Sequence, residues 1–355
     1  MHRPALVSAP RGIPQVVGPR LSVAPMMNVT DRHFRVLMRG ITTRTWLYTE
    51  MLTTASLLQD RGPALLQVEP VEPPLVLQLG GDDPSALARC ATMARRRAYA
   101  ELNLNVGCPS ASVRSGGFGA ALMLRPARVA DCVRAMSDAF GARVTVKHRL
   151  GVDGRESFQS LIDFVGAVAA AGAARFIVHA RVARLSGLSP RQNRQVPPLR
   201  PDWVHALKGW FPHVPIEING EIRSLAQAER YLHQLDGVMI GRAAREAPML
   251  FADVDSRVSP ERVEPPTRRQ VVRRYRSWLS RELVAGTSPL LLLRPLQHLY
   301  SGCPGARRWR RALARIDRHS PGDTIVRQLD DAIDEVERLH ATARSHRLGE
   351  TVCVR

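Results

Sequence analysis

A single cysteine at the end of an apolar strand is the residue of this 355-residue chain whose setting best suits chemistry. Residues 103–110 read Asn-Leu-Asn-Val-Gly-Cys-Pro-Ser, so a strand-like pattern runs directly into a glycine, Cys108 and a proline. The carboxyl ends of parallel strands are where α/β proteins hold ligands and catalytic groups. A lone cysteine is more often a buried structural thiol. A catalytic role for Cys108 therefore depends on which residues lie at the ends of the other strands.

Polar residues and glycines also follow the other strand-like segments. Eight such segments alternate with helical patterns, over 21–25, 46–50, 75–79, 101–105, 143–147, 175–179, 214–219 and 236–241. Besides Cys108, their ends carry Pro25, Met26, Met27, Glu50, Gln78, Asn105, Lys147, His179, Asn219, Gly220, Glu221, Gly241 and Arg242. Any one of these would be a structural residue, whereas their convergence on one face of a sheet predicts a ligand site.

Eight strand–helix repeats predict an α/β fold, a (β/α)8 TIM barrel followed by an all-helical domain. Helix start signals support the alternation, for example Asp83-Pro84 before 85–97 and Arg125-Pro126 before 127–139. A dinucleotide-binding sheet is disfavoured because no Gly-x-Gly-x-x-Gly turn follows the first strand. The glycines of 115–119 follow Cys108 instead, and we interpret them as a mobile loop of the site.

The strand pattern stops after Asp255, where a Pro265-Pro266 pair and long helical stretches follow. This change indicates a domain boundary. We expect an N-terminal tail over 1–20, a barrel over 21–255, a linker over 256–266, a basic helical domain over 267–345 and a tail over 346–355.

The net charge of +19 is concentrated in the helical part. Residues 267–318 hold thirteen arginines against two acids, Glu282 and Asp317, which is a net charge of +11. Such a surface binds the phosphates of nucleic acids through counterion release, and tRNA or rRNA is favoured here over DNA or a membrane. The alternative is a solvated helix face without a partner.

Two further patterns concern anions. The turns Asn219-Gly220 and Gly241-Arg242 follow the seventh and eighth strands, where barrels commonly bind phosphate, because glycine lets backbone N–H groups approach the oxygens. The chain has two lysines, Lys147 and Lys208, among 51 basic residues. An ammonium at a strand end therefore indicates a role that the planar guanidinium of arginine does not fill.

Cysteine usage and hydropathy indicate a cytoplasmic protein. The five cysteines contain no Cys-x-x-Cys pair, so we expect reduced thiols and neither a metal site nor a disulfide framework. Residues 1–20 lack the apolar core of a signal peptide, and no segment is long and apolar enough for a membrane span. We expect no obligate protein partner.

Taken in order, these motifs resemble the tRNA-dihydrouridine synthase family, most closely its A-type bacterial branch. The resemblance extends over about residues 21–315. It is carried by Ala24-Pro25-Met26-Met27, Tyr48-Thr49-Glu50-Met51, Leu77-Gln78-Leu79-Gly80-Gly81, residues 103–110, Val146-Lys147, His179-Ala180-Arg181, Ile218-Asn219-Gly220, residues 237–242, and Pro304-Gly305-Ala306-Arg307.

The resemblance implies an enzyme that uses FMN, with NADPH as reductant, to saturate the 5,6 double bond of a uridine in the D loop of tRNA, at position 20, 20a or both. It implies that Cys108 gives the proton to C5 while hydride reaches C6, and a thiol mostly protonated at neutral pH suits that role. It assigns FMN contacts to Pro25, Met26, Met27, Gln78, Lys147, His179, Asn219, Gly220, Glu221, Gly241 and Arg242. It assigns tRNA contacts to Asn105, Arg191, Arg194, Arg294 and Arg307.

Three positions depart from the family pattern: Glu221 stands where a second glycine is usual, and Pro295 and His298 alter a motif of the helical domain. Three alternatives remain open. One is a flavin reductase of free pyrimidines, and another is a Schiff-base aldolase that uses Lys147. The third is a tRNA-binding protein without activity. The first two leave the basic domain unexplained, and an intact Cys108, Lys147 and His179 argue against the third.

Overall fold

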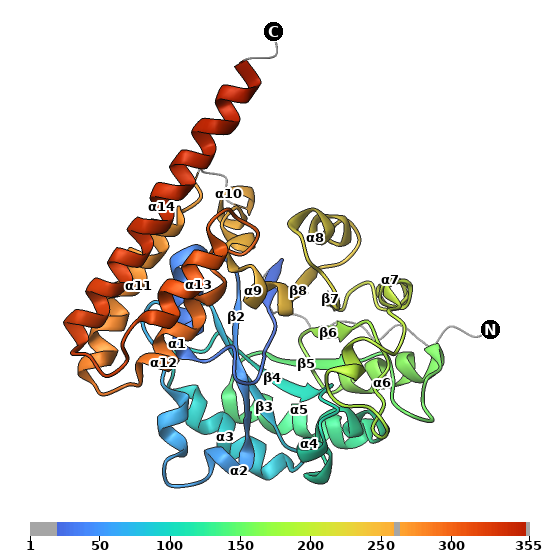
Figure 1. Ribbon diagram of the computed structural model, residues 1–355. Coiled ribbons are helices and arrows are strands. Elements are labelled where there is room, and N and C mark those ends of the chain that lie inside the picture. Colours follow the sequence, from blue (N-terminus) through green and yellow to red (C-terminus); the bar gives the residue numbers. More distant parts are fainter. Residues whose placement is uncertain (1–19, 259–262, 353–355) are drawn as a thin grey trace. The chain divides into compact units, whose positions relative to one another are not determined.

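A computed structural model describes residues 20–258 and 263–352, and within them eight parallel strands form a barrel (Figure 1). The strands follow the order β1-β8-β7-β6-β5-β4-β3-β2, and a bridge between Ser22 and Trp46 joins the two ends of the sheet. The predicted TIM barrel is therefore confirmed. The strands are β1 (Leu21–Val23), β2 (Leu47–Thr53), β3 (Leu75–Gly80), β4 (Glu101–Val106), β5 (Val144–Arg149), β6 (Phe176–His179), β7 (Ile216–Asn219) and β8 (Gly237–Ile240).

Every predicted strand is present, with ends that differ by one to three residues. The most consequential difference is at β5, which continues two residues beyond Lys147 to Arg149. Because side chains alternate along a strand, Lys147 and Arg149 lie on one face and His148 on the other. His148 is fully buried in the strand and packs against the rings of Phe164 and Phe176.

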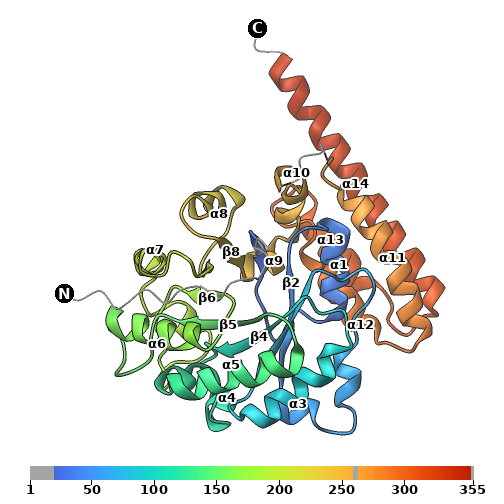
Figure 2. The same cartoon turned by 180° about the vertical axis from the view of Figure 1, so that it is seen from behind.

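The contacts divide the chain into two compact units. The first contains residues 46–241 with β1, and Figure 2 shows α3, α5 and α6 on the outside of its strands. Most of its helices start at side-chain caps or prolines, as at α3, where Asp83 accepts from the N–H of Ala86. They are α2 (Thr54–Leu57), α3 (Pro84–Arg95), α4 (Ala111–Ser115), α5 (Pro126–Phe140), α6 (Phe158–Ala170), α7 (Pro201–Trp210) and α8 (Leu225–Leu232), with short 3-10 turns at Gly62–Leu66, Gly119–Leu124 and Gln192–Arg194.

The barrel interior is apolar on one side and polar on the other. Ala24, Tyr48, Val76, Ile177 and Met239 form a buried apolar cluster. The inward-facing positions of β4 and β5, together with Gln78 of β3, are instead occupied by carboxamides, a hydroxyl and charged groups. Parallel strands usually bury apolar residues on both faces, so this polar half is a feature that packing alone does not require.

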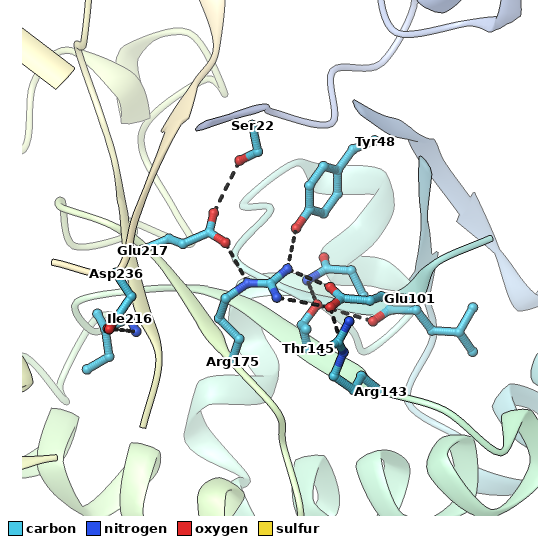
Figure 3. A network of polar contacts seen from close by, with 11 residues as sticks. Ser22, Tyr48, Glu101, Arg143, Thr145, Arg175, Ile216, Glu217 and Asp236 are labelled. Carbon is cyan, nitrogen blue, oxygen red and sulfur yellow. Dashed lines mark hydrogen bonds and ion pairs between the residues drawn. The ribbon is translucent and has the colours of Figure 1, made fainter. Parts of the chain in front are cut away.

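At the amino-terminal end of the strands, a group of ionised side chains fills the barrel; we call it the floor network (Figure 3). The Arg175 guanidinium bonds both carboxylate oxygens of Glu101, at 3.1 and 2.6 Å, and forms an ion pair with Glu217 at 2.5 Å. Arg143 also reaches Glu101, at 3.0 Å, and Ser22 donates to Glu217 at 3.2 Å. The buried acids at the floor are thus matched by cations from the neighbouring strands.

The second unit joins residues 28–45 to the chain from Arg242 onwards. Its helices are α1 (Arg32–Ile41), α9 (Arg242–Glu246), α10 (Val254–Val258), α11 (Arg268–Val284), α12 (Pro289–Leu293), α13 (Ala306–Arg315) and α14 (Gly322–Val352), with 3-10 turns at Pro248–Phe251 and Arg294–His298. Trp278 of α11 donates to His33 of α1 at 3.2 Å, and Asp255 accepts the hydroxyl protons of Thr42 and Thr43. These contacts attach the segment between β1 and β2 to the C-terminal helices.

The observed division differs from the expected one. It falls at Arg242 instead of at 256–266, because residues before 256 pack with the helices that follow. The first residues of the expected linker end α10, and the helix α14 continues to Val352, into the expected tail. Residues 1–19, 259–262 and 353–355, which include most of the predicted N-terminal tail and Cys353, lie outside the described residues.

Acids of α14 neutralise part of the basic helices beside it, and both views show α11 and α14 side by side (Figures 1 and 2). Three arginines of α11 and α13 form ion pairs with α14, namely Arg269 with Asp334, Arg276 with Asp330 and Arg308 with Glu335. Other arginines, such as Arg307 and Arg311, are exposed and form no ion pair with a described residue. The unmatched positive charge is therefore smaller than the sequence count.

Candidate active site at the barrel mouth

The carboxyl-terminal end of the barrel, which we call the mouth, brings several predicted site residues together. Gln78 and Asn105 are hydrogen-bonded to each other, with the Asn105 Nδ2 atom donating to Gln78 Oε1 at 2.9 Å. Their exposed fractions are 1% and 8%. Both carboxamides are thus oriented by each other before any ligand binds.

Cys108 lies in a turn whose backbone is fixed from two directions. Asn105 Oδ1 accepts from the backbone N–H groups of Gly107 and Cys108, at 3.2 and 3.0 Å. The Cys108 thiol is partly exposed and lies 3.3 Å from the hydroxyl of Ser110. At Gly119, where φ is +68°, a Cβ atom would lie 2.5 Å from the carbonyl oxygen of Cys108. The glycine-rich segment therefore packs closely against the turn that holds the thiol.

Lys147 is partly buried beside Asn219. Its Nζ atom donates to Asn219 Oδ1 at 3.1 Å, and the Asn219 Nδ2 atom donates to the carbonyl of Met239 at 2.8 Å. Burial, together with the charge of the nearby Arg149 guanidinium, lowers the pKa of Lys147 to about 7. A lysine with this pKa exchanges its proton readily near neutral pH.

Positive side chains surround His179 at the mouth. Burial lowers the pKa of His179 well below its usual range, and the cations that add to the lowering are Arg149, Lys147, Arg181 and Arg194. The pKa of Arg149 itself is lowered to about 10 by burial. Among these cations Arg181 forms an ion pair with Glu221 at 2.9 Å, whereas Lys147 and Arg149 form none with a described residue.

The turn after β7 fits a close approach of another group. Gly220 has a φ of +132°, and a Cβ atom there would lie 2.9 Å from Leu199 and 3.2 Å from the ring of His179. Glu221, where the family usually has glycine, adopts a φ of +51° and turns its carboxylate to Arg181. The position thus keeps a backbone conformation typical of glycine although its side chain is large.

The remaining residues assigned to the cofactor follow β1 and β8. Pro25 and Met26 are half-buried, Met27 is 56% exposed, and a Cβ atom on Gly241 would contact Ala24 at 3.7 Å. Gly241 therefore lies beside the end of β1. Arg242 begins α9 in the second unit.

The four arginines assigned to tRNA have different surroundings. Arg191 and Arg194 flank a single 3-10 turn after β6, and Arg191 is exposed. Arg294 forms an ion pair with Asp31, the residue that caps α1, so this guanidinium is already matched within its unit. Arg307 is exposed at the start of α13.

Three residues that are buried at the mouth were not predicted from the sequence. Arg149 is 4% exposed and donates to the carbonyls of Gly107 and Asn193, which connects the Cys108 turn to the loop after β6. Arg181 and Asn103 are also buried there. The alternation of Lys147, His148 and Arg149 would have revealed Arg149, because residues two apart on a strand share a face.

Other kinds of site have no support in the part of the chain that the structure describes. No group of three or more histidine, cysteine or acidic side chains is arranged to hold a metal ion among those residues. The four cysteines within 20–352 are unpaired thiols. None of the described helices combines the length and hydropathy needed to cross a bilayer.

Comparison with known proteins identifies the family. Residues 22–337 match the model of the family described as dihydrouridine synthase (Dus). A tRNA-dihydrouridine(20/20a) synthase of Synechocystis sp. is 49% identical over 83% of this chain and 88% of its own length. Proteins of the same name from Pseudomonas aeruginosa and Escherichia coli (strain K12) are 45% and 46% identical over 92% and 86% of this chain, and over 97% and 88% of their own lengths.

A solved structure supports the fold alone. A 2-naphthoyl-CoA reductase matches with a TM-score of 0.51 at 13% identity, over 66% of this chain and 49% of that protein. The sequence relatives reach much further, because they cover the barrel and most of the helical unit at more than 40% identity. The chain is a member of the dihydrouridine synthase family.

Proposed function

We propose that this protein reduces uridine to 5,6-dihydrouridine in the D loop of tRNA, at position 20, 20a or both. The observation that carries the proposal is the convergence, at one barrel mouth, of the Cys108 thiol, the Gln78 and Asn105 carboxamides and a cation cluster short of acids. The names of relatives with 45–49% identity support the choice of tRNA and of these positions.

The mouth fits FMN. A flavin phosphate would supply negative charge to the cations around His179, and backbone N–H groups of the turn at Gly220 would donate to its oxygens. The carboxamide of Gln78 matches the alternating donors and acceptors of a pyrimidine edge. The other proposed contacts of FMN are Pro25, Met26, Met27, Lys147, Asn219, Glu221, Gly241 and Arg242. FMN, when bound, would supply hydride to C6 of the uracil, with NADPH as the reductant.

Cys108 would hold the proton that C5 of the uracil requires. Its backbone is fixed by Asn105, and its thiol is partly exposed towards solvent, where a base extruded from the tRNA can approach. Lys147, whose pKa of about 7 lies close to working pH, would stabilise negative charge next to it. Asn105 would contact the base with the remaining hydrogen of its amide.

The arginines of the loop after β6 and of the helical unit would hold the tRNA backbone. Arg191, Arg194, Arg294 and Arg307 are the proposed contacts, and Arg307 is exposed and unmatched by any described acid. We place the reaction in the cytoplasm, where tRNA is available. A flavin reductase of free pyrimidines would need the mouth but not these arginines.

The direct test incubates purified protein with FMN, NADPH and an unmodified tRNA transcript, and maps dihydrouridine by position. We expect product at position 20, 20a or both, and none with Cys108→Ala although this variant still binds and reduces FMN. Free uridine and uracil serve as competing substrates. Reduction of these without reduction of the tRNA would replace the proposal with the free-pyrimidine alternative.

A further inference from the structure

Four polar side chains inside the barrel form one continuous line of hydrogen bonds. Thr145 donates its hydroxyl proton to the carbonyl of Leu102 at 3.1 Å and accepts from Asn103 Nδ2 at 2.9 Å. Asn103 Oδ1 accepts from Gln78 Nε2 at 2.7 Å, and Gln78 Oε1 accepts from Asn105 Nδ2 at 2.9 Å. None of the four is more than 8% exposed. We call Thr145, Asn103, Gln78 and Asn105 the amide chain.

The two ends of the amide chain fix the orientation of every carboxamide in it. A backbone carbonyl only accepts, so Thr145 must donate to Leu102 and is left to accept from an amide NH2 group. At the other end, the N–H groups of Gly107 and Cys108 only donate, and both donate to Asn105 Oδ1. If one carboxamide were reversed, its NH2 group would face another donor and its oxygen would face another acceptor. Both of these buried contacts would then lack a hydrogen bond.

Both ends of the proposed chemistry depend on this orientation. The order of oxygen and nitrogen in Gln78 decides which of its atoms faces the pyrimidine edge of a flavin. The position of Asn105 Oδ1 decides where the Cys108 backbone lies. Asn103 is the link that transmits the orientation from Thr145, since it bonds Thr145 and Gln78 at once.

We infer that Asn103 and Thr145 are positioning residues: acting through Gln78 and Asn105, they set the hydrogen-bonding order offered to the flavin and the position of the Cys108 turn. The reaction concerned is the one proposed above, so this inference rests on it. Thr145 lies at the lower end of the line, next to the floor network (Figure 3).

The test compares Thr145→Val with Thr145→Ser. Valine keeps the volume but removes the hydroxyl, so Asn103 loses the partner that fixes its orientation, whereas serine keeps that partner. Leaving a buried amide without its partner is expected to change an equilibrium constant by about tenfold, which is about 1.4 kcal/mol. We expect Thr145→Val to weaken FMN binding about tenfold, to change the visible spectrum of the bound flavin and to lower kcat about tenfold. Thr145→Ser should stay within about twofold of the wild type.

Two readouts separate this role from a contribution to stability alone. A Thr145→Val protein that melts at a lower temperature but keeps wild-type FMN affinity, flavin spectrum and kcat would overturn the inference. In flavin-free protein, the rate at which iodoacetamide alkylates Cys108 is measured on the peptide that contains this residue. This rate should differ from the wild-type rate in Thr145→Val but not in Thr145→Ser. If valine prevents folding, Thr145→Cys, whose thiol is a weak donor, should give an intermediate loss of FMN affinity.

Failure of the proposed reaction would look different. A wild-type protein that binds FMN but forms no dihydrouridine refutes the reaction, whereas FMN affinity and the alkylation rate still decide whether the amide chain sets the site. Wild-type-like values in Thr145→Val for both would then refute the positioning role as well.

Discussion

Arginine meets opposite conditions at the two ends of this barrel. At the floor, burial lowers the pKa of Arg175, but the charges of Glu217 and Glu101 outweigh burial and hold the pKa well above its usual range. At the mouth, burial together with the charges of Arg194 and Arg181 lowers the pKa of Arg149 to about 10. One end has its counter-charges built into the strands, and the other does not.

The difference separates charges that hold the fold from charges that await a ligand. The floor network forms within the barrel itself, because Glu101 and Glu217 lie in β4 and β7 and their cations directly precede β5 and β6. The mouth has four cations near one histidine: Arg181 is paired with Glu221, Arg194 lies nearby, and Lys147 and Arg149 form no ion pair with a described residue. Its charge balance is reached when an anion enters.

The largest effect should follow from breaking the floor network. Arg175→Met leaves Glu217 and Glu101 buried without their main cation, and the free energy of unfolding should fall by about 3–5 kcal/mol. Chemical denaturation of the flavin-free protein measures it. Arg308→Met is the matched control, because its ion pair with Glu335 is exposed and should contribute under about 1 kcal/mol. If both variants lose the same free energy of unfolding, the ion pairs of the floor network stabilise the fold no more than an exposed ion pair does.

At the mouth, the same kind of substitution should affect binding more than stability. Lys147→Met removes a cation without a matched acid, so the melting temperature of flavin-free protein should be unchanged or raised. FMN affinity should fall tenfold or more, which is about 1.4 kcal/mol. Calorimetry and flavin fluorescence titration provide the two measurements. If the variant loses stability but keeps its FMN affinity, Lys147 stabilises the fold, as the residues of the floor network do, and does not bind the flavin.

The comparison extends to the arginines of the helical unit. Arg311 forms no ion pair with a described residue, whereas Arg276 is paired with Asp330 at 3.1 Å. Arg311→Gln should lower the slope of log K against log salt for tRNA binding by about 0.7–0.9, the contribution of one phosphate contact. Arg276→Gln should change that slope little. Identical slopes for the two variants would show that pairing with α14 does not select the RNA-binding arginines.

The smallest effect is a pH dependence. The folded pKa of Lys147, about 7, lies below the usual lysine value, so between these values the unfolded chain binds a proton that the folded protein does not. Stability of flavin-free protein should therefore rise with pH above about 7 relative to Lys147→Met. Denaturation of both proteins at pH 7 and pH 9 tests the sign. If the stability of Lys147→Met rises equally between pH 7 and pH 9, the rise comes from the titration of another group.

Local patterns were sufficient to predict the strands and the strand-end residues. Gln78, Lys147 and His179 each end a run of apolar residues, and alternation within five or six residues is enough to find them. The amide chain and the floor network escaped prediction because their members are distant in sequence. Arg175 and Glu101 are 74 residues apart, and Asn103 and Thr145 are 42 apart, so their pairing depends on which strands become neighbours.

The domain boundary escaped prediction for a related reason. The segment 28–45 contains an ordinary amphipathic helix, and nothing in its own residues indicates that it packs with helices made much later. Its partners, among them Trp278 and Asp255, become apparent only from the contacts.

That arrangement has a consequence for synthesis on the ribosome. His33 of α1 and its partner Trp278 are 245 residues apart. At about 5–20 residues per second, α1 emerges roughly 10–50 s before the helix that covers it. During this interval the strands of the barrel are completed while α1 lacks these partners, so a nascent chain of this protein is expected to expose the apolar face of α1 to chaperones until translation is nearly finished.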